Sequence, residues 1–155
     1  MKTCCFTGHR PKKLNFNNIF ILKQKLKNSI IVAINCGYEN FISGMALGCD
    51  MLAADIVLEL QKIYPIKLEC AIPCVNQTEF WKEEDIKNYK RILRKANKIT
   101  YTSNAKYYNG CMQKRNKYMV DNSSRIIAVF NGTPGGTMQT LKYAESKNLE
   151  IDIIQ

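Results

Sequence analysis

The chain has 155 residues, 46% of them apolar, which is enough to build the core of one domain of ordinary size. This composition excludes a disordered chain, and no window approaches the roughly 18–20 apolar residues of a membrane span. With 23 basic and 13 acidic residues the formal net charge is +10, which indicates anionic partners, although scattered lysines are also typical of solvated helix faces. We expect a single domain over residues 1–155 of a soluble, cytoplasmic protein, whose polar N-terminus is no signal peptide.

The seven cysteines do not form a recognisable disulfide or metal pattern. Their number is odd, no pair has the CxxC spacing, and His9 is the only histidine. Cys4, Cys5 and Cys70 lie inside apolar runs, where a thiol behaves as a small apolar group. We therefore expect buried, reduced thiols, no bound metal and no cofactor.

Strands and helices alternate along the chain. Apolar residues at spacings of three and four mark helices, short β-branched runs mark strands, and glycine or proline separates them. In chain order we predict a strand at 4–7, a helix at 19–33, a strand at 41–42, a helix at 52–63, a strand at 66–72, a helix at 78–96 capped by Thr78, a strand at 98–102, a helix at 111–121, a strand at 125–131, a helix at 138–147 and a strand at 151–154. This order predicts an α/β fold, a Rossmann-like three-layer α/β/α sandwich with a mostly parallel sheet of about six strands.

Three loops that follow predicted strands carry glycines and hydroxyls. They are "TGHRP" at 7–11, "SGMALGCD" at 43–50 and "NGTPGGT" at 131–137. In a parallel sheet, ligands bind at the carboxyl ends of the strands, and glycines at a helix start let backbone N–H groups approach an anion. None of the loops is a Walker or GxGxxG motif, and each glycine alone also fits an ordinary tight turn. Together the loops predict a phosphate site at one edge of the sheet.

Four single residues extend this predicted site, each with an alternative. His9 lies in a glycine turn, where contact with a ligand is favoured over a place in the core. Arg10 precedes a proline, and its guanidinium there either binds a phosphate or carboxylate or points into water. Asp50 caps the second helix or accepts a hydrogen bond from a ribose hydroxyl. Trp81 packs in the core or forms a stacking wall for a base.

Several motifs resemble those of the SLOG superfamily, in its short single-domain bacterial and phage proteins. They are "FTGHRP", "SGMALGCDMLAADIVLEL", "AIPC" followed by "FW", and "GGT" at the last helix, and the resemblance covers nearly the whole chain. This superfamily of Rossmann-like domains also contains the DNA-processing protein DprA and the LOG-type phosphoribohydrolases, and its members often dimerise, which leaves a homo-oligomer open. The resemblance implies binding of a nucleotide or nucleotide-derived molecule. Carried over by position, it implies ligand contacts from Gly8, Arg10, Ser43, Gly44, Gly48, Gly135, Gly136 and Thr137.

The resemblance to the LOG-type enzymes is incomplete where those enzymes carry out catalysis. They have an MxxRKxxM helix and a PGGxGTxxE turn, whose arginine and glutamate serve in N-glycosidic cleavage. Here "MQKRNKYM" keeps Arg115 but has Asn116 for the lysine, and Gln139 and Thr140 follow the glycine turn where the glutamate is expected. A glutamine has no charge to stabilise an oxocarbenium-like transition state and cannot act as a base. The remaining catalytic candidates are Arg115 and Asp50.

The favoured function is therefore non-catalytic binding, for sensing or sequestration, of a nucleotide or nucleotide-derived small molecule, without contact to a membrane. Two alternatives stay open: a phosphoribohydrolase-like nucleotide N-glycosidase, and DprA-like binding of single-stranded nucleic acid. The second is less favoured because the sequence has no run of interleaved aromatic and basic residues. The predicted ligand-binding residues are Thr7, Gly8, His9, Arg10, Ser43, Gly44, Met45, Gly48, Asp50, Trp81, Arg115, Gly135, Gly136 and Thr137.

Overall fold

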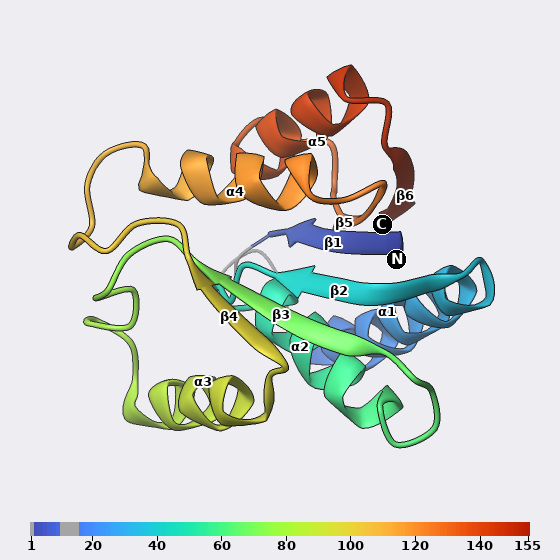
Figure 1. Cartoon of the computed structure of the whole chain (residues 1–155), viewed down its shortest axis with the longest axis horizontal. Coiled ribbons are helices and arrows are strands. Elements are labelled where there is room, and N and C mark those ends of the chain that lie inside the picture. Colours follow the sequence, from blue (N-terminus) through green and yellow to red (C-terminus); the bar gives the residue numbers. More distant parts are fainter. Residues whose placement is uncertain (1, 10–15) are drawn as a thin grey trace.

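A computed structural model describes residues 2–9 and 16–155 of the chain (Figure 1). Strand and helix alternate throughout this part, as the sequence pattern predicts. In chain order the elements are β1 (Lys2–Gly8), α1 (Phe16–Asn35), β2 (Tyr38–Ser43), α2 (Cys49–Leu60), β3 (Lys67–Ile72), α3 (Glu83–Lys95), β4 (Lys98–Tyr101), α4 (Cys111–Asp121), β5 (Arg125–Val129), α5 (Gly136–Ser146) and β6 (Glu150–Ile154).

The strands form one six-stranded sheet in the order β4-β3-β2-β1-β5-β6, in which all paired strands are parallel. The predicted α/β class and mostly parallel sheet are thus confirmed. The chain moves outward from β1 through β2 and β3 to β4, then returns to the other side of β1 with β5 and β6. Strand order therefore reverses between β1 and β5, where Gly8 pairs with Val129. In open parallel sheets such a reversal leaves a crevice at the carboxyl ends of the strands.

The helices cover both faces of the sheet, which completes the three layers (Figure 1). α1, α2 and α3 pack together on one face, and α4 and α5 pack together on the other. Along β1, Cys4 and Phe6 belong to the core on the α1–α3 side, while Cys5 belongs to the core on the α4–α5 side. Successive side chains of a strand point to opposite faces, so a central strand buried on both sides reads as a continuous apolar run. Within residues 2–9 and 16–155, no helix combines the length and the apolar character needed to cross a membrane.

All seven cysteines are free thiols, and all except Cys36 are buried. Cys36 departs from the prediction because it lies in the turn after α1, where the chain passes over the surface. Burial raises the pKa of Cys5, Cys49 and Cys70 to about 12, since a buried thiolate loses its hydration. These thiols therefore stay neutral at physiological pH and act as small apolar groups of the core.

One helix boundary differs clearly from the prediction. α3 begins at Glu83, whereas the pattern placed its start at Thr78. Residues 75–80 form turns instead, and the backbone N–H of Trp81 donates to the Thr78 carbonyl at 3.0 Å. The acidic residues Glu83, Glu84 and Asp85 occupy the first turn of the helix, where their charge complements the positive end of the helix dipole. The charge pattern therefore marks the start of this helix better than the hydroxyl at Thr78 does.

Candidate functional site

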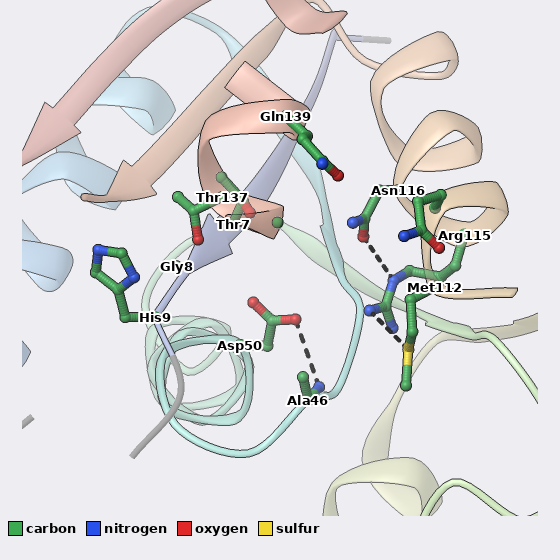
Figure 2. A pocket seen from close by; sticks show the side chains of 12 residues that line it. Thr7, Gly8, His9, Ala46, Asp50, Met112, Arg115, Asn116, Thr137 and Gln139 are labelled. Atoms are coloured by element: carbon green, nitrogen blue, oxygen red, sulfur yellow. Dashed lines mark hydrogen bonds between the residues drawn. The ribbon is translucent and has the colours of Figure 1, made fainter. Parts of the chain in front are cut away.

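A cavity of about 320 Å³, here called the main cavity, lies at the carboxyl end of β1 (Figure 2). It coincides with the reversal of strand order, the place where the topology favours a ligand crevice. Its walls come from the carboxyl end of β1, the loop before α2 with the first turn of that helix, one side of α4 and the start of α5. The lining residues are Thr7, Gly8, His9, Ala46, Asp50, Met112, Gln113, Arg115, Asn116, Gly136, Thr137 and Gln139.

The end of β1 forms one wall because α2 starts directly against it. A Cβ atom added at Gly8 would lie 2.6 Å from the Cβ and 2.9 Å from the Sγ of Cys49, so only glycine allows this approach. His9 is buried, and its Nε2 accepts a hydrogen bond of 3.0 Å from the backbone N–H of Asn131. The imidazole thus joins the segments that follow β1 and β5 while it also lines the main cavity. Arg10 lies outside the described residues, so its predicted role stays a prediction.

The loop 43–48 is shaped by polar contacts among its own residues. The Ser43 hydroxyl donates to the backbone carbonyl of Asp50 at 2.7 Å and accepts from the backbone N–H of Met45 at 3.2 Å. The Asp50 carboxylate accepts from the backbone N–H of Ala46 at 3.4 Å. Met45 is buried at φ 58° and Gly48 has φ 93°, both left-handed, which turns the chain tightly into α2. Ser43, Met45 and Gly48 therefore build this loop, whereas Asp50 and Ala46 line the main cavity.

Arg115 is a charged residue with only 3% of its surface exposed. Its guanidinium donates to the backbone carbonyl of Gly44, to the Asn116 side-chain oxygen at 2.9 Å, and to the Met112 sulfur at 3.6 Å. A Cβ atom at Gly44 would lie 2.8 Å from the guanidinium carbon of Arg115, so this glycine makes room for the arginine. Gly44 thus holds Arg115 in place at the wall of the main cavity and is not among the lining residues.

The start of α5 presents backbone N–H groups to the main cavity. Its N-cap, Gly135, has φ 149° and no side chain, so no hydroxyl or carboxylate caps the first turn. That first turn contains no acidic residue, whereas the first turn of α2 contains Asp50. The positive end of the α5 dipole therefore faces the cavity beside Gly136 and Thr137. Figure 2 shows the Thr137 hydroxyl and the Asp50 carboxylate directed toward the same space.

Trp81 lies away from the main cavity. Its ring meets Tyr89 edge-on, with 5.4 Å between the ring centroids, and packs against the core on the α1–α3 side of the sheet. These contacts are those of a residue packed against the core, and it is not among the lining residues of the main cavity; the stacking role stays a prediction.

Five lining residues were absent from the predicted site: Ala46, Met112, Gln113, Asn116 and Gln139. Met112 carries a signal that a helical projection of "MQKRNKYM" reveals, because it lies three residues before Arg115 and four before Asn116, and residues at these spacings are neighbours on a helix surface. Gln139 lies one turn into α5 from Gly136 and faces α4 across the cavity (Figure 2). Ala46 has no such signal, since it enters the wall only through the shape of its loop.

The main cavity combines charges of both signs. Arg115 lies at its α4 side and Asp50 at its α2 side, and both side chains are buried. Cys49, next to Gly8, is a neutral thiol at pH 7 because burial, and then the negative charge of Asp50, raise its pKa to about 12. Among residues 2–9 and 16–155, no three His, Cys, Asp or Glu side chains gather as metal ligands would. The cavity thus offers an arginine, a helix start and a single carboxylate to a polar ligand.

Solved structures with a similar fold include two DNA-processing proteins. The chain matches DNA processing protein A of Helicobacter pylori with a TM-score of 0.68 and 17% identity, and that of Streptococcus pneumoniae with a TM-score of 0.71 and 14% identity. The alignments cover 98% and 100% of this chain but only 65% of the Helicobacter pylori protein and 50% of the Streptococcus pneumoniae protein. A third similar structure, TM1055, matches 97% of this chain and 72% of its own, with a TM-score of 0.60 and 13% identity. At these identities the likeness shows the fold alone.

Sequence relatives cover the chain at higher identity. The UPF0398 proteins of Bacillus thuringiensis strain Al Hakam and Bacillus cereus strain AH187 are each 29% identical to it over 159 aligned residues, which is 98% of this chain and 86% of theirs. The YpsA family model, described as the YspA SLOG family, matches residues 4–155. That match includes β1 from Cys4 onward, every later element through β6 and all lining residues of the main cavity. The chain therefore belongs to the YspA SLOG family.

Proposed function

We propose that the main cavity binds a nucleotide or a nucleotide-derived molecule and does not cleave its N-glycosidic bond. The observation that carries this proposal is the meeting of two anion-attracting groups in one cavity. The uncapped start of α5 and the buried guanidinium of Arg115 both line the cavity, which lies where strand order reverses. A phosphate group is the anion that such a helix start binds most readily, through backbone N–H groups and the helix dipole.

The other polar groups of the cavity suit a sugar. The Asp50 carboxylate accepts hydrogen bonds only, and the Thr7 and Thr137 hydroxyls both donate and accept, which matches the hydroxyls of a ribose. All three side chains are buried, so their hydrogen bonds to a ligand are shielded from water. The cavity volume of about 320 Å³ is at the lower end of the roughly 300–1,000 Å³ of small-molecule sites, so a mononucleotide-sized ligand is favoured.

The same residues argue against turnover. Cleavage of a ribosyl bond needs a carboxylate beside the developing positive charge, and the LOG-type pattern supplies a glutamate after the glycine turn. Here Gln139 occupies the cavity wall one turn into α5, and it carries no charge. Asp50 is the only carboxylate among the lining residues of the described chain, and its contact with the Ala46 N–H ties it to the loop before α2. The proposed role is therefore binding, for sensing or sequestration.

A thermal-shift series with 5′-AMP, GMP, CMP and UMP tests this proposal. A nucleotide at a hundred times its dissociation constant should stabilise the fold by about 2.7 kcal/mol, which corresponds to a rise in melting temperature of roughly 5–10 °C for a chain of this size. Chromatography of the same mixtures should find no free base above background. The proposal fails if no nucleotide raises the melting temperature, and its non-catalytic part fails if base is released.

A pair of threonine variants places the binding in the main cavity. Thr137→Val removes a hydroxyl that lines the cavity and should weaken nucleotide binding about fivefold, the typical effect of losing one hydrogen bond of about 1 kcal/mol between neutral groups. Thr3→Val removes a hydroxyl from the opposite end of β1 and serves as the matched control, with affinity unchanged. Equal affinities for both variants would place the nucleotide elsewhere on the protein.

Binding of single-stranded nucleic acid is a second candidate function. It is favoured by the formal net charge of +10 and by the fold shared with DNA processing protein A of Helicobacter pylori, whose single-stranded DNA binding mode has been described. A labelled oligo(dT) strand measured at several salt concentrations separates the two functions. Binding along a phosphate backbone weakens steeply with salt, whereas binding of a single mononucleotide in the main cavity neutralises fewer phosphates and depends on salt much less.

A further inference from the structure

A second, smaller cavity of about 210 Å³ lies between α4 and α5, here called the α4–α5 pocket. Its lining residues are Gln113, Asn116, Lys117, Gln139, Thr140 and Tyr143. Three of them, the amide residues Gln113, Asn116 and Gln139, also line the main cavity. The two cavities are therefore neighbours that share one wall, and this wall consists of amide side chains.

Two of the three side chains in the shared wall are held by no hydrogen bond within the described part of the chain. Neither Gln113 nor Gln139 makes a side-chain hydrogen bond within the described part of the chain, and both side chains are exposed. Rotation about their side-chain bonds therefore breaks no hydrogen bond, and a ligand in the main cavity meets only these amides on its way to the α4–α5 pocket. Asn116 differs, because its oxygen accepts from Arg115 at 2.9 Å, which leaves its NH₂ group to face a ligand. Figure 2 shows the Asn116 and Gln139 amides directed toward the space between the two helices.

The far end of the α4–α5 pocket is aromatic and positively charged. The Tyr143 hydroxyl donates to the Asp121 carboxylate at 2.6 Å, which links α5 to the end of α4. The Lys117 and Lys147 ammonium groups lie 5.7 and 5.5 Å from the centroid of that ring. A flat ring that carries carbonyl or ring-nitrogen acceptors fits such surroundings, through stacking on the tyrosine and hydrogen bonds from a lysine.

These observations lead to a more specific ligand. Resting on the function proposed above, we infer that the nucleobase of the bound nucleotide lies in the α4–α5 pocket, while its sugar and phosphate lie in the main cavity. The amides of the shared wall face the edge of the base, and an amide both donates and accepts hydrogen bonds, as the edges of nucleobases do. The base is thereby recognised by side chains of α4 and α5.

Calorimetric titration of ribose 5-phosphate against the four nucleoside 5′-monophosphates tests this inference. Ribose 5-phosphate contains the groups assigned to the main cavity and lacks the base. At least one nucleotide should bind about tenfold more tightly than ribose 5-phosphate, a contribution expected for one stacked and hydrogen-bonded base. Equal affinity for ribose 5-phosphate and all nucleotides overturns the inference and leaves the proposed function standing. Failure of all five probes to bind overturns both.

A tyrosine variant tests the assigned pocket. In Tyr143→Ala the ratio of the ribose 5-phosphate and nucleotide dissociation constants should fall about tenfold, because the stacking face is lost. Tyr107→Ala is the matched control, since this exposed tyrosine lines neither cavity, and its ratio should stay that of the parent protein. An unchanged ratio in Tyr143→Ala overturns the inference.

Photolabelling gives an answer that does not depend on any variant. In 8-azidoadenosine 5′-monophosphate the reactive azide is on the base, so the labelled peptides report where the base lies. The label is expected within 113–117 of α4 or 139–143 of α5. Labelling of the 75–82 segment, which precedes α3 and contains Trp81, would instead place the base next to α3 and overturn the inference.

Discussion

A single methyl group added at Gly8 tests how the main cavity is built. The Cβ of an alanine there would lie 2.6 Å from the Cβ of Cys49 and 3.2 Å from the Cβ of Val129. Real Cβ atoms do not approach one another to 2.6 Å, and the Cβ of Cys49 moves only together with the backbone of α2. Gly8→Ala must therefore push the start of α2 away from β1.

The expected cost follows from overpacking a buried site. Insertion of one methyl group into a close-packed core costs roughly 1–3 kcal/mol. For a chain of this length, that lowers the melting temperature by on the order of 5 °C. Ligand binding should weaken as well, because Asp50 is part of the helix start that moves and it lines the main cavity.

Gly136→Ala is the matched control, since it adds the same methyl group at the same cavity. Nothing lies within 4 Å of a Cβ atom at Gly136, and this residue is the first of α5. Alanine there should keep the stability of the ligand-free protein or raise it by up to about 1 kcal/mol, because alanine loses less backbone freedom on folding than glycine does. Urea unfolding of the ligand-free proteins measures both effects. If Gly8→Ala is as stable as Gly136→Ala, the close approach of β1 and α2 does not require a glycine at position 8.

Three further predictions concern the charged and thiol groups. Arg10→Ala should leave the melting temperature of the ligand-free protein nearly unchanged and weaken ligand binding at least about thirtyfold. Arg10→Lys should restore only part of the affinity. If calorimetry finds equal affinities for Arg10→Ala and the parent protein, Arg10 is only a solvated residue. Asp50→Asn should lower the affinity for nucleotides more than that for inorganic phosphate, since the carboxylate is proposed to bind the sugar, and titration with both probes decides this. The stability that the buried thiols contribute should be fully present below about pH 9 and fall as pH rises toward 12, because Cys5 and Cys49 keep their protons in the folded state while unfolded thiols lose theirs. Urea unfolding at pH 8 and 10 measures this fall. Iodoacetamide at pH 8 should modify the exposed Cys36 first.

The layered architecture follows from local sequence patterns. Helical spacing and β-branched runs depend on residues close together in the chain, so alternation of strand and helix is readable without tertiary information. A parallel sheet then places the ends of all strands at one edge, which is why the loops after Gly8 and Ser43 and the loop before Gly136 were expected together. The start of α3 was misread because a hydroxyl at Thr78 resembled a cap, while the acidic turn at Glu83 carried the stronger electrostatic signal.

The wall of the site was decided by packing over long sequence separations. Arg115 reaches the carbonyl of Gly44, 71 residues away, only because α4 crosses the sheet on the face opposite α2. The strand order β4-β3-β2-β1-β5-β6, which puts the reversal beside β1, likewise has no local signature, since each strand pairs with a partner chosen by the whole sheet. Gln113 and Gln139 read as ordinary solvated helix residues until α4 and α5 bring them to one wall. Side-chain contacts across elements depend on how whole helices and strands pack, and that information is spread over the entire chain.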